Sequence, residues 1–495
     1  MGSDSLYTSL QIAAGSLTKP SRRKLVMKLL ADPLDQRDNC GVGFIANLNG
    51  ERSHSILKKS IESVINLTHR GAVSADGKTG DGAGILTQIP TKLLIKELKS
   101  NQIELSDDTT IGVGMVFLPR AWDEASERCK AIIEEVVKDR GLQFFGWRDV
   151  PIDEDALGER ALKTLPYIKQ VLVGAPDNFV QKDDNAFERE LYLARKIIQS
   201  RIISQGINEF HFASFSSRTI VYKGLFVAAQ LPRFYADLAN EDYETSFAVF
   251  HQRYSTNTFP TWPLAQPFRM IAHNGEINTI RANRNWMAAR EGDLESSLWG
   301  EEIENLIPVI EEFGSDSFSL DNALELLNLS GRDIRHAAMM LIPEAWEEMP
   351  DMDPKVRAFY EYHSCVSEPW DGPAALAFTD GRFIAASLDR NGFRPARYVI
   401  TNDGMIILAS EVGTIEIDAT TVTKRGRLGP GEMLAVDVET GKVFENDELK
   451  SLFSSRQDYT KWVDNQIIHL EDEEQNLKNS WEAPNPSTQE LLTRQ

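Results

Sequence analysis

The sequence has 495 residues, of which 42% are hydrophobic and 26% charged, and this composition excludes a disordered, collagen-like or coiled-coil chain. Lys and Arg number 53 against 74 Asp and Glu, and the formal net charge of -21 argues against nonspecific binding to nucleic acid or an anionic membrane. The sequence has no apolar run of the roughly 20 residues that a membrane-spanning helix needs. We therefore expect a small-molecule substrate and no membrane partner.

The sequence has only three cysteines, Cys40, Cys129 and Cys365. Because their number is odd and they lie far apart, they do not indicate a disulfide framework. A reducing compartment fits best, and we expect the cytoplasm, or a plastid or other organelle if the N-terminal segment includes a transit peptide. Three cysteines also exclude a four-thiolate zinc or iron–sulfur site within this chain. We predict no metal site, and structural roles for Cys129 and Cys365.

Three segments are predicted along the chain. Residues 1–39 are rich in Ser and Thr, carry a basic cluster at 22–24 and lack a strand pattern, so they are predicted to be a leader or propeptide. Residues 40–465 are predicted to form the folded domain. Residues 466–495 are acidic, polar and Pro-containing, which is typical of a linker.

The folded part begins with a predicted strand over 40–48, a turn at Asn49-Gly50 and a helix over 54–67 with apolar residues at helical spacing. Short apolar runs bounded by turn residues predict further strands, and two Asp-Gly turns predict hairpins. The predicted strands are 111–118, 210–217, 219–231 and 247–255, the hairpins 374–389 and 396–410, and the helices 188–203 and 320–331.

A glycine-rich segment, HRGAVSADGKTGDGAG, covers 69–84. A phosphate-binding loop is excluded there because Ala72 stands where that motif needs its first glycine, and because a predicted helix precedes the segment. Two interpretations remain: a loop in which the backbone approaches another group closely, or an ordinary surface loop.

Cys40 is either a small buried residue at the start of a strand or a nucleophile. If the chain were cut between Asn39 and Cys40, one residue would carry both a thiol and a free α-amine. An α-amine titrates near 7.7–8.0 and a thiol near 8.5, so the amine can accept the thiol proton at neutral pH and return it to a leaving group.

Three later strings could serve such a nucleophile, each with a plainer alternative. In HQRYSTN, at 251–257, Arg253 could hold a carboxylate with two hydrogen bonds or form a surface salt bridge. In HNGEIN, at 273–278, the Asn274 side chain and the Gly275 N–H could form an oxyanion hole or a tight hairpin turn. In FGSDS, at 313–317, Asp316 could bind an ammonium group or cap the following helix.

The strings CGVGF at 40–44, HRGA at 69–72 and GDGAG at 80–84 precede HQRYSTN, HNGEIN and GSDS in the sequence. In this order, and with DRNGFRPAR at 389–397, they closely resemble the glutaminase domain of glutamate synthase large subunits over roughly 40–463. That domain belongs to the class II glutamine amidotransferases, which are N-terminal-nucleophile (Ntn) hydrolases. The resemblance implies an α+β fold, a four-layer αββα sandwich of two antiparallel sheets.

The resemblance also implies roles for matched residues. Cys40 matches the nucleophile released by propeptide removal, and Arg70 the arginine that helps to position it. Arg253 matches the residue that binds the glutamine α-carboxylate and Asp316 the one that binds its α-amine. Asn274 and Gly275 match the oxyanion hole.

The implied reaction is glutaminase chemistry, in which L-glutamine forms a Cys40 thioester, ammonia leaves and hydrolysis yields glutamate. In the complete enzyme of ammonia assimilation and glutamate biosynthesis, ammonia reaches a synthase site that carries FMN and a 3Fe-4S cluster and aminates 2-oxoglutarate. The family takes electrons from NADPH, NADH or ferredoxin. We expect this chain to bind none of these cofactors itself and to depend on a synthase domain or subunit.

Two alternatives stay open on the sequence. The chain could be a class II amidotransferase for another acceptor, such as a phosphoribosyl or sugar-phosphate substrate. It could instead be a catalytically silent regulatory module from which the leader is never removed.

Overall fold

The computed structural model describes residues 40–100, 103, 109–177, 179–180, 183, 185–253, 259–312 and 314–467. The predicted leader lies outside these residues, as does the predicted linker from 468 onward. None of the helices in this described part has the length and apolar character that a bilayer crossing requires.

The first sheet is built around β1 (Gly41–Asn47), the strand predicted directly after Cys40. Val42 and Phe44 enter one hydrophobic cluster and Ile45 enters another, because successive side chains point to opposite faces of a strand. Both faces of β1 are therefore buried, which explains its unbroken run of apolar and small residues. Within the described residues, seven strands pair antiparallel in the order β14 (Val422–Arg427), β12 (Arg397–Thr401), β13 (Met405–Ala409), β1, β8 (Phe247–Gln252), β2 (Ala83–Gln88) and β7 (Thr219–Gly224).

A second antiparallel sheet packs face to face on the first. Phe44 of β1 shares a buried cluster with Ala377 and Leu434, so the two sheets enclose a common core. The described strands of this second sheet run in the order β16 (Lys442–Phe444), β15 (Met433–Asp437), β11 (Phe383–Leu388), β10 (Ala374–Thr379) and β9 (Ile271–Gly275).

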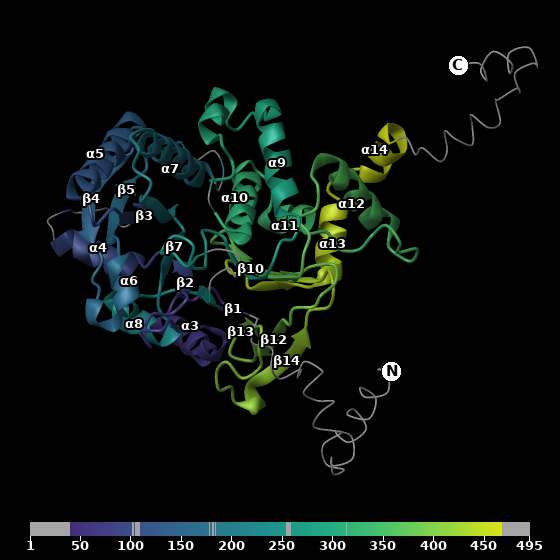
Figure 1. Cartoon of the computed structure of the whole chain (residues 1–495). Coiled ribbons are helices and arrows are strands. Elements are labelled where there is room, and N and C mark those ends of the chain that lie inside the picture. The colour runs from purple at the N-terminus through teal and green to yellow at the C-terminus, as the bar shows by residue number, and fades with distance from the viewer. Residues whose placement is uncertain are drawn as a thin grey trace, which may run out of the picture. The chain divides into compact units, whose positions relative to one another are not determined.

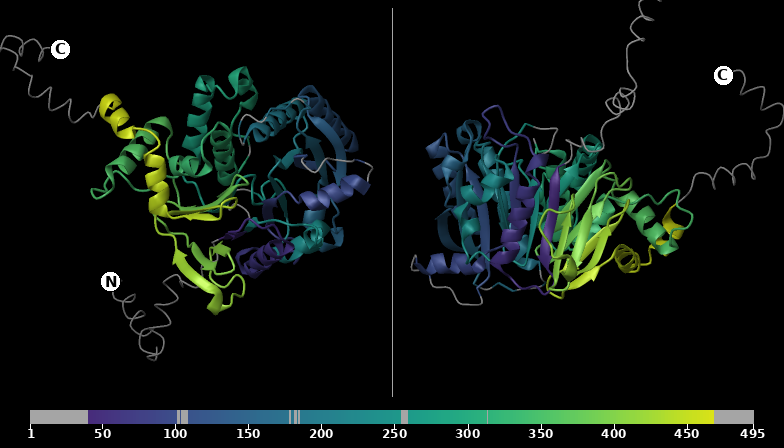
Figure 2. Two further views of the ribbon diagram at one scale, coloured as in Figure 1. Left: turned by 180° about the vertical axis from the view of Figure 1, so that it is seen from behind. Right: turned by 90° about the horizontal axis from the view of Figure 1, so that it is seen from below.

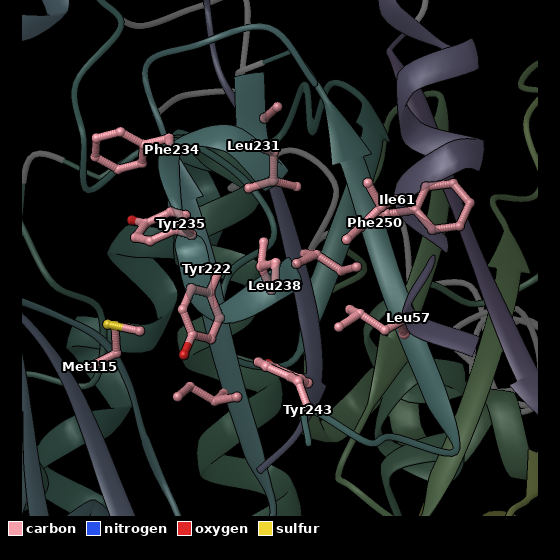
Figure 3. Packing of buried hydrophobic residues seen from close by; sticks show 14 of the residues in the cluster. Leu57, Ile61, Met115, Tyr222, Leu231, Phe234, Tyr235, Leu238, Tyr243 and Phe250 are labelled. Carbon is pink, nitrogen blue, oxygen red and sulfur yellow. The ribbon is translucent and has the colours of Figure 1, made fainter. Parts of the chain in front are cut away.

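Helices cover both outer faces of this sandwich. Leu57 and Ile61 of α3 (His54–Asn66) pack in one cluster with Phe250 of β8, on the outer side of the first sheet (Figure 3). Figure 1 places α9, α10 and α11 on the side of β10 that faces away from β1. The helices that bury residues against the second sheet are α9 (Ile280–Arg290), α10 (Asp316–Leu329), α11 (Ile334–Leu341), α12 (Pro354–Val366), α13 (Asn446–Ser454) and α14 (Tyr459–Gln466).

The α+β fold with two stacked antiparallel sheets between helical layers is thus confirmed. A third sheet goes beyond the prediction: its described strands run β4 (Gln143–Asp149), β5 (Tyr167–Gly174), β3 (Ile111–Leu118) and β6 (His211–Ser216). Figure 2 shows this blue segment at the opposite end of the sandwich from the yellow-green C-terminal strands. Its own core is shared with α5 (Asp123–Asp139) and α7 (Ala186–Ser204). The remaining described helices are α4 (Thr91–Ser100), α6 (Glu159–Lys163), α8 (Leu231–Phe234) and the short 3-10 helices 68–70, 154–156, 228–230, 236–239, 291–293, 300–306 and 419–421.

Most predicted elements are confirmed, including both Asp-Gly hairpins, where Gly381 and Gly404 take the positive φ values of +94° and +81°. Two strand ends were placed too late. The strand predicted over 219–231 ends at Gly224, because a 3-10 helix and then α8, with Pro232 in its first turn, occupy the rest. The strand predicted over 247–255 ends at Gln252, since Arg253 leaves the extended region with a φ of +92°.

Candidate active site

Cys40 lies directly before β1, and its backbone is held by the side chain of Asn274, 234 positions away in the sequence. The Asn274 Oδ1 accepts a hydrogen bond from the Cys40 N at 3.2 Å, and the Asn274 Nδ2 donates to the Cys40 O at 3.0 Å. Both residues are buried. The structure therefore brings the predicted nucleophile and a predicted oxyanion residue into direct contact.

Four charged side chains act on the Cys40 thiol. Burial is the dominant effect and raises its pKa to about 11. Arg253 and Arg394 lower that pKa, whereas Asp81 and Asp316 raise it. The thiol is accordingly protonated at neutral pH, and a nucleophilic role would require a base beside it.

Asn274 and Gly275 end strand β9, which pairs with β10 about a hundred positions later, with Gly275 opposite Ala374. The alternative of a tight Asn-Gly hairpin turn is therefore wrong. Gly275 has a φ of +140°, and a Cβ added there would lie 1.7 Å from the Pro373 carbonyl O. Only glycine fits this position, where the backbone turns away from the strand next to Asn274.

Asp316 is the first residue of α10 and is 5% exposed. The helix cap is Ser315, whose Oγ accepts from the Phe318 N, so the capping alternative for Asp316 is wrong. The Asp316 Oδ2 instead accepts a hydrogen bond from the Ile277 N at 2.8 Å, three residues after Asn274. The carboxylate is thereby held close to the end of β9.

Arg253 directly follows β8 and has the positive φ of +92° noted above, which is unusual for a residue with a side chain. Its backbone N donates to the Gly82 O at 2.8 Å, and its Nε lies 3.5 Å from the Asp81 Oδ2. This ion pair is largely buried, not the surface salt bridge of the alternative interpretation, since Asp81 is 8% exposed. The rest of the HQRYSTN motif, 254–257, lies outside the described residues.

Arg70 ends a 3-10 helix over 68–70, and its Nε is ion-paired with Glu411, which lies two residues after β13. The neighbouring Gly71 packs on the residue before Arg253: a Cβ there would lie 2.2 Å from the Gln252 Nε2. Arg70 is thus the sequence neighbour of a glycine that packs against Gln252, and its side chain is ion-paired with Glu411.

Arg394 is a residue that sequence reasoning missed as a site residue, although it lies in the DRNGFRPAR motif. Gly43 of β1 and Arg397 of β12 both pair with Ala409, and Cys40 and Arg394 each lie three residues before the paired position, ahead of the start of the strand. The charge of Arg394 lowers the pKa of the Cys40 thiol. The Arg394 Nε is buried and has no hydrogen-bond partner among the described residues.

The glycine-rich segment behaves as the close-approach interpretation predicts. A Cβ on Gly80 would lie 2.2 Å from the backbone of Phe226, so the loop packs closely against the segment that directly follows β7. Lys78 is exposed, and its Nζ donates a hydrogen bond to the Asp155 O. Asp81, the second residue of the GDGAG string at 80–84, acts on the Cys40 thiol and was also not selected by the sequence analysis.

Among the described residues, no three His, Cys, Asp or Glu side chains are grouped so that they could hold a metal ion. Cys129 is buried in the core of the third sheet and Cys365 is exposed on α12. The cysteines therefore do not converge as an iron–sulfur cluster would require.

The family model for class II glutamine amidotransferases matches residues 40–462. The NADPH glutamate synthase large chain of Azospirillum brasilense is 47% identical over 441 residues, which is 89% of this chain and 29% of that one. The corresponding chain of Bacillus subtilis is 43% identical over 94% of this chain and 30% of its own length. Ferredoxin-dependent glutamate synthase 1 of Arabidopsis thaliana, named as chloroplastic or mitochondrial, is 43% identical over 91% and 28%.

The chain therefore spans less than a third of the length of these relatives. Among solved structures, the B. subtilis glutamine phosphoribosylpyrophosphate amidotransferase complexed with ADP and GMP is similar with a TM-score of 0.28 and 13% identity, over 68% of this chain and 49% of that one.

Proposed function

Because the chain belongs to the class II glutamine amidotransferases, we propose that it is the glutaminase portion of a glutamate synthase. In this proposal Cys40 cleaves the side-chain amide of L-glutamine, releasing ammonia for a synthase portion that lies beyond this chain. The observation that carries the proposal is the pair of hydrogen bonds between Asn274 and the backbone of Cys40, because it assembles nucleophile and oxyanion donor from distant strands.

Activation of the nucleophile would depend on cleavage before Cys40. The free α-amine would then replace the peptide N that now donates to the Asn274 Oδ1. That hydrogen bond would hold the amine beside its own thiol, whose pKa of about 11 leaves it protonated at neutral pH. The amine accepts the thiol proton as the sulfur attacks the glutamine amide carbon.

Charge complementarity supports an amino-acid substrate. The site places the cations Arg253 and Arg394 and the carboxylates Asp81 and Asp316 around one thiol. A zwitterion needs one partner of each sign, and a guanidinium can bind a carboxylate at two points. We assign the α-carboxylate to Arg253 and the α-ammonium to Asp316.

The tetrahedral oxyanion would be stabilised by Asn274 and Gly275. The Nδ2 of Asn274 carries two hydrogens, one of which is used by the Cys40 O, so the second can donate to the oxyanion. Collapse of this intermediate breaks the C–N bond, and the proton held by the α-amine leaves with the ammonia. Water then attacks the thioester, and glutamate is released with the thiol restored.

The fate of the ammonia is a proposal about the longer enzyme. We propose that a synthase domain or subunit takes it up and aminates 2-oxoglutarate, with FMN and a 3Fe-4S cluster carried there and not by this chain. The relatives are named for NADPH, ferredoxin or NADH, so the electron donor would be decided by that portion. A cytoplasmic or plastid location is likewise proposed from the bacterial and chloroplastic relatives.

The test is glutamine hydrolysis by the wild-type chain and by Cys40→Ala, after intact mass and N-terminal sequencing of both. We expect the wild type to begin at Cys40 and to release ammonia from glutamine, and Cys40→Ala to release none. A wild type that begins at Cys40 but does not hydrolyse glutamine would refute the proposal. If the wild type does hydrolyse glutamine, a synthase partner and 2-oxoglutarate are added and glutamate formation is measured. Net formation of glutamate from 2-oxoglutarate distinguishes a glutamate synthase from an amidotransferase that uses another acceptor.

A further inference from the structure

Asp81 is a buried carboxylate for which the fold provides little compensation. It is 8% exposed, and neither carboxylate oxygen accepts a hydrogen bond from the described residues. Its backbone is fixed, because the Asp81 N donates to the Ala72 O at 3.1 Å. Carboxylates that stabilise a fold are normally hydrogen-bonded when they are buried, so this one calls for another explanation.

The partner of Asp81 is Arg253. The Asp81 Oδ2 lies 3.5 Å from the Arg253 Nε, and the next residue, Gly82, accepts a hydrogen bond from the Arg253 N. The same two residues of the GDGAG loop thus contact both the backbone and the guanidinium of Arg253. They do so at the point where Arg253 adopts its positive φ of +92°.

Asp81 contacts Arg253 at Nε, the guanidinium nitrogen that is bonded to the aliphatic part of the side chain. A carboxylate that binds a guanidinium at two points can use the two terminal nitrogens, which a partner at Nε does not occupy. The contact between Asp81 and Nε is an ion pair without a hydrogen bond, and its attraction favours one orientation of the guanidinium plane, which leaves the other edge to an incoming carboxylate.

The surrounding charges fit such an arrangement. Arg253, after β8, and the Cys40 thiol, before β1, both interact electrostatically with Asp81, and the backbone of Ala72 also lowers the pKa of this carboxylate. The same thiol also interacts with Asp316 on α10 and Arg394 after β11. Two cations and two carboxylates balance each other there.

We propose that Asp81 is a positioning residue for substrate recognition: it holds the Arg253 guanidinium in the orientation that binds the α-carboxylate of an amino-acid substrate. This inference rests on the proposed function, because the carboxylate in question is that of glutamine. It gives the GDGAG loop a role that neither its glycines nor its position explains alone.

The experiment compares four proteins: wild type, Asp81→Asn, Arg253→Lys and the double variant. Each is expressed as the full chain and used after processing, so that it begins at Cys40. Asp81→Asn should raise the KM for glutamine about tenfold while kcat changes much less, because the lost contact orients the ground-state partner. The double variant should be no worse than Arg253→Lys alone, since both changes remove one function. The matched control is Asp155→Asn, which removes the same charge from an exposed residue whose backbone O accepts a hydrogen bond from the Lys78 Nζ of the same glycine-rich segment.

An unchanged KM in Asp81→Asn would overturn the proposal, and so would additive effects in the double variant, which would mean that Asp81 acts independently of Arg253. The pH profile provides a second readout. In the wild type, KM should rise as the pH falls below about 6, where Asp81 becomes protonated, and this rise should be absent from Asp81→Asn.

Failure of the proposed function remains distinguishable. If the wild type hydrolyses no glutamine, calorimetric titration of L-glutamine into Cys40→Ala and into Cys40→Ala/Asp81→Asn still measures the contribution of Asp81 to binding. Weaker binding in the second protein would support the positioning role without any turnover. Equal dissociation constants, or no binding to either protein, would overturn it.

Discussion

Asp321 of α10 accepts hydrogen bonds from the Met270 N at 2.8 Å and the Ile271 N at 3.1 Å, at the start of β9. The helix that carries Asp316 is thereby tied to the strand that carries Asn274. The opposite end of the same strand is tied again, because Asp316 accepts from the Ile277 N. Two carboxylates of α10 thus bind the backbone at the start of β9 and just after its end. Asn274 of this strand in turn makes the hydrogen bonds to the Cys40 backbone.

We expect Asp321→Ala to destabilise the protein by about 3 kcal/mol or more, because it removes the acceptor of three buried backbone N–H groups, those of Arg269, Met270 and Ile271. Equilibrium unfolding in urea measures this change. Asp155→Ala, at an exposed position, should change the unfolding free energy by no more than about 0.5 kcal/mol. A loss as small as that in Asp321→Ala would mean that other groups or water satisfy these N–H groups.

Local patterns were sufficient to predict the central part of the fold. The strand after Cys40, the helix with Leu57 and Ile61, and both Asp-Gly hairpins each follow from a periodicity or a turn signal within about 15 residues. Strand ends were less predictable. Arg253 ends β8 by adopting a positive φ, and no property of the residue type predicts that conformation.

The candidate site was predicted through its motifs and not through its contacts. Cys40 and Asn274 are 234 positions apart, so only the assembled sheets show that one holds the other. Arg394 and Asp81 were missed for a related reason: each lies in a noted string, but its meaning depends on strand register or on a partner far along the chain. The third sheet was also missed as a separate unit, since its strands have no sequence feature that separates them from the rest.

Asn274→Ala should chiefly lower kcat for glutamine hydrolysis, by on the order of a hundredfold, because one oxyanion donor is removed. The KM should change less than kcat. Steady-state kinetics of ammonia release measure both constants, and Asn402→Ala, at an exposed position in the turn after β12, provides the control. A normal kcat would reassign Asn274 to holding the Cys40 backbone only.

Arg253→Lys should weaken glutamine binding despite the retained charge, because an ammonium cannot reproduce the planar two-point contact with a carboxylate. The expected result is a KM at least about tenfold higher. Arg425→Lys, on the exposed face of β14, makes the same chemical change away from the site and should leave KM unaltered. An unchanged KM in Arg253→Lys would remove that residue from carboxylate recognition.

The cost of burying Asp81 should be measurable as a pH dependence of stability. Burial raises its pKa from 3.8 to about 6, although the backbone of Ala72 and the charge of Arg253 oppose the shift. An acid whose pKa is higher in the folded state destabilises that state as the pH rises, here between about 4 and 6, and a difference of about two pKa units corresponds to about 3 kcal/mol.

Asp81→Asn removes this ionisation, so its unfolding free energy relative to the wild type should rise by about 3 kcal/mol between pH 4 and pH 7. Urea unfolding at pH 4, 5.5 and 7 measures the difference, and Asp155→Asn is the control at an exposed position. The substitution would then stabilise the protein while weakening glutamine binding, a combination that is expected of a residue kept for function. If Asp81→Asn instead lost stability relative to the wild type as the pH rose, the ion pair with Arg253 would be a stabilising contact, and its role would be structural.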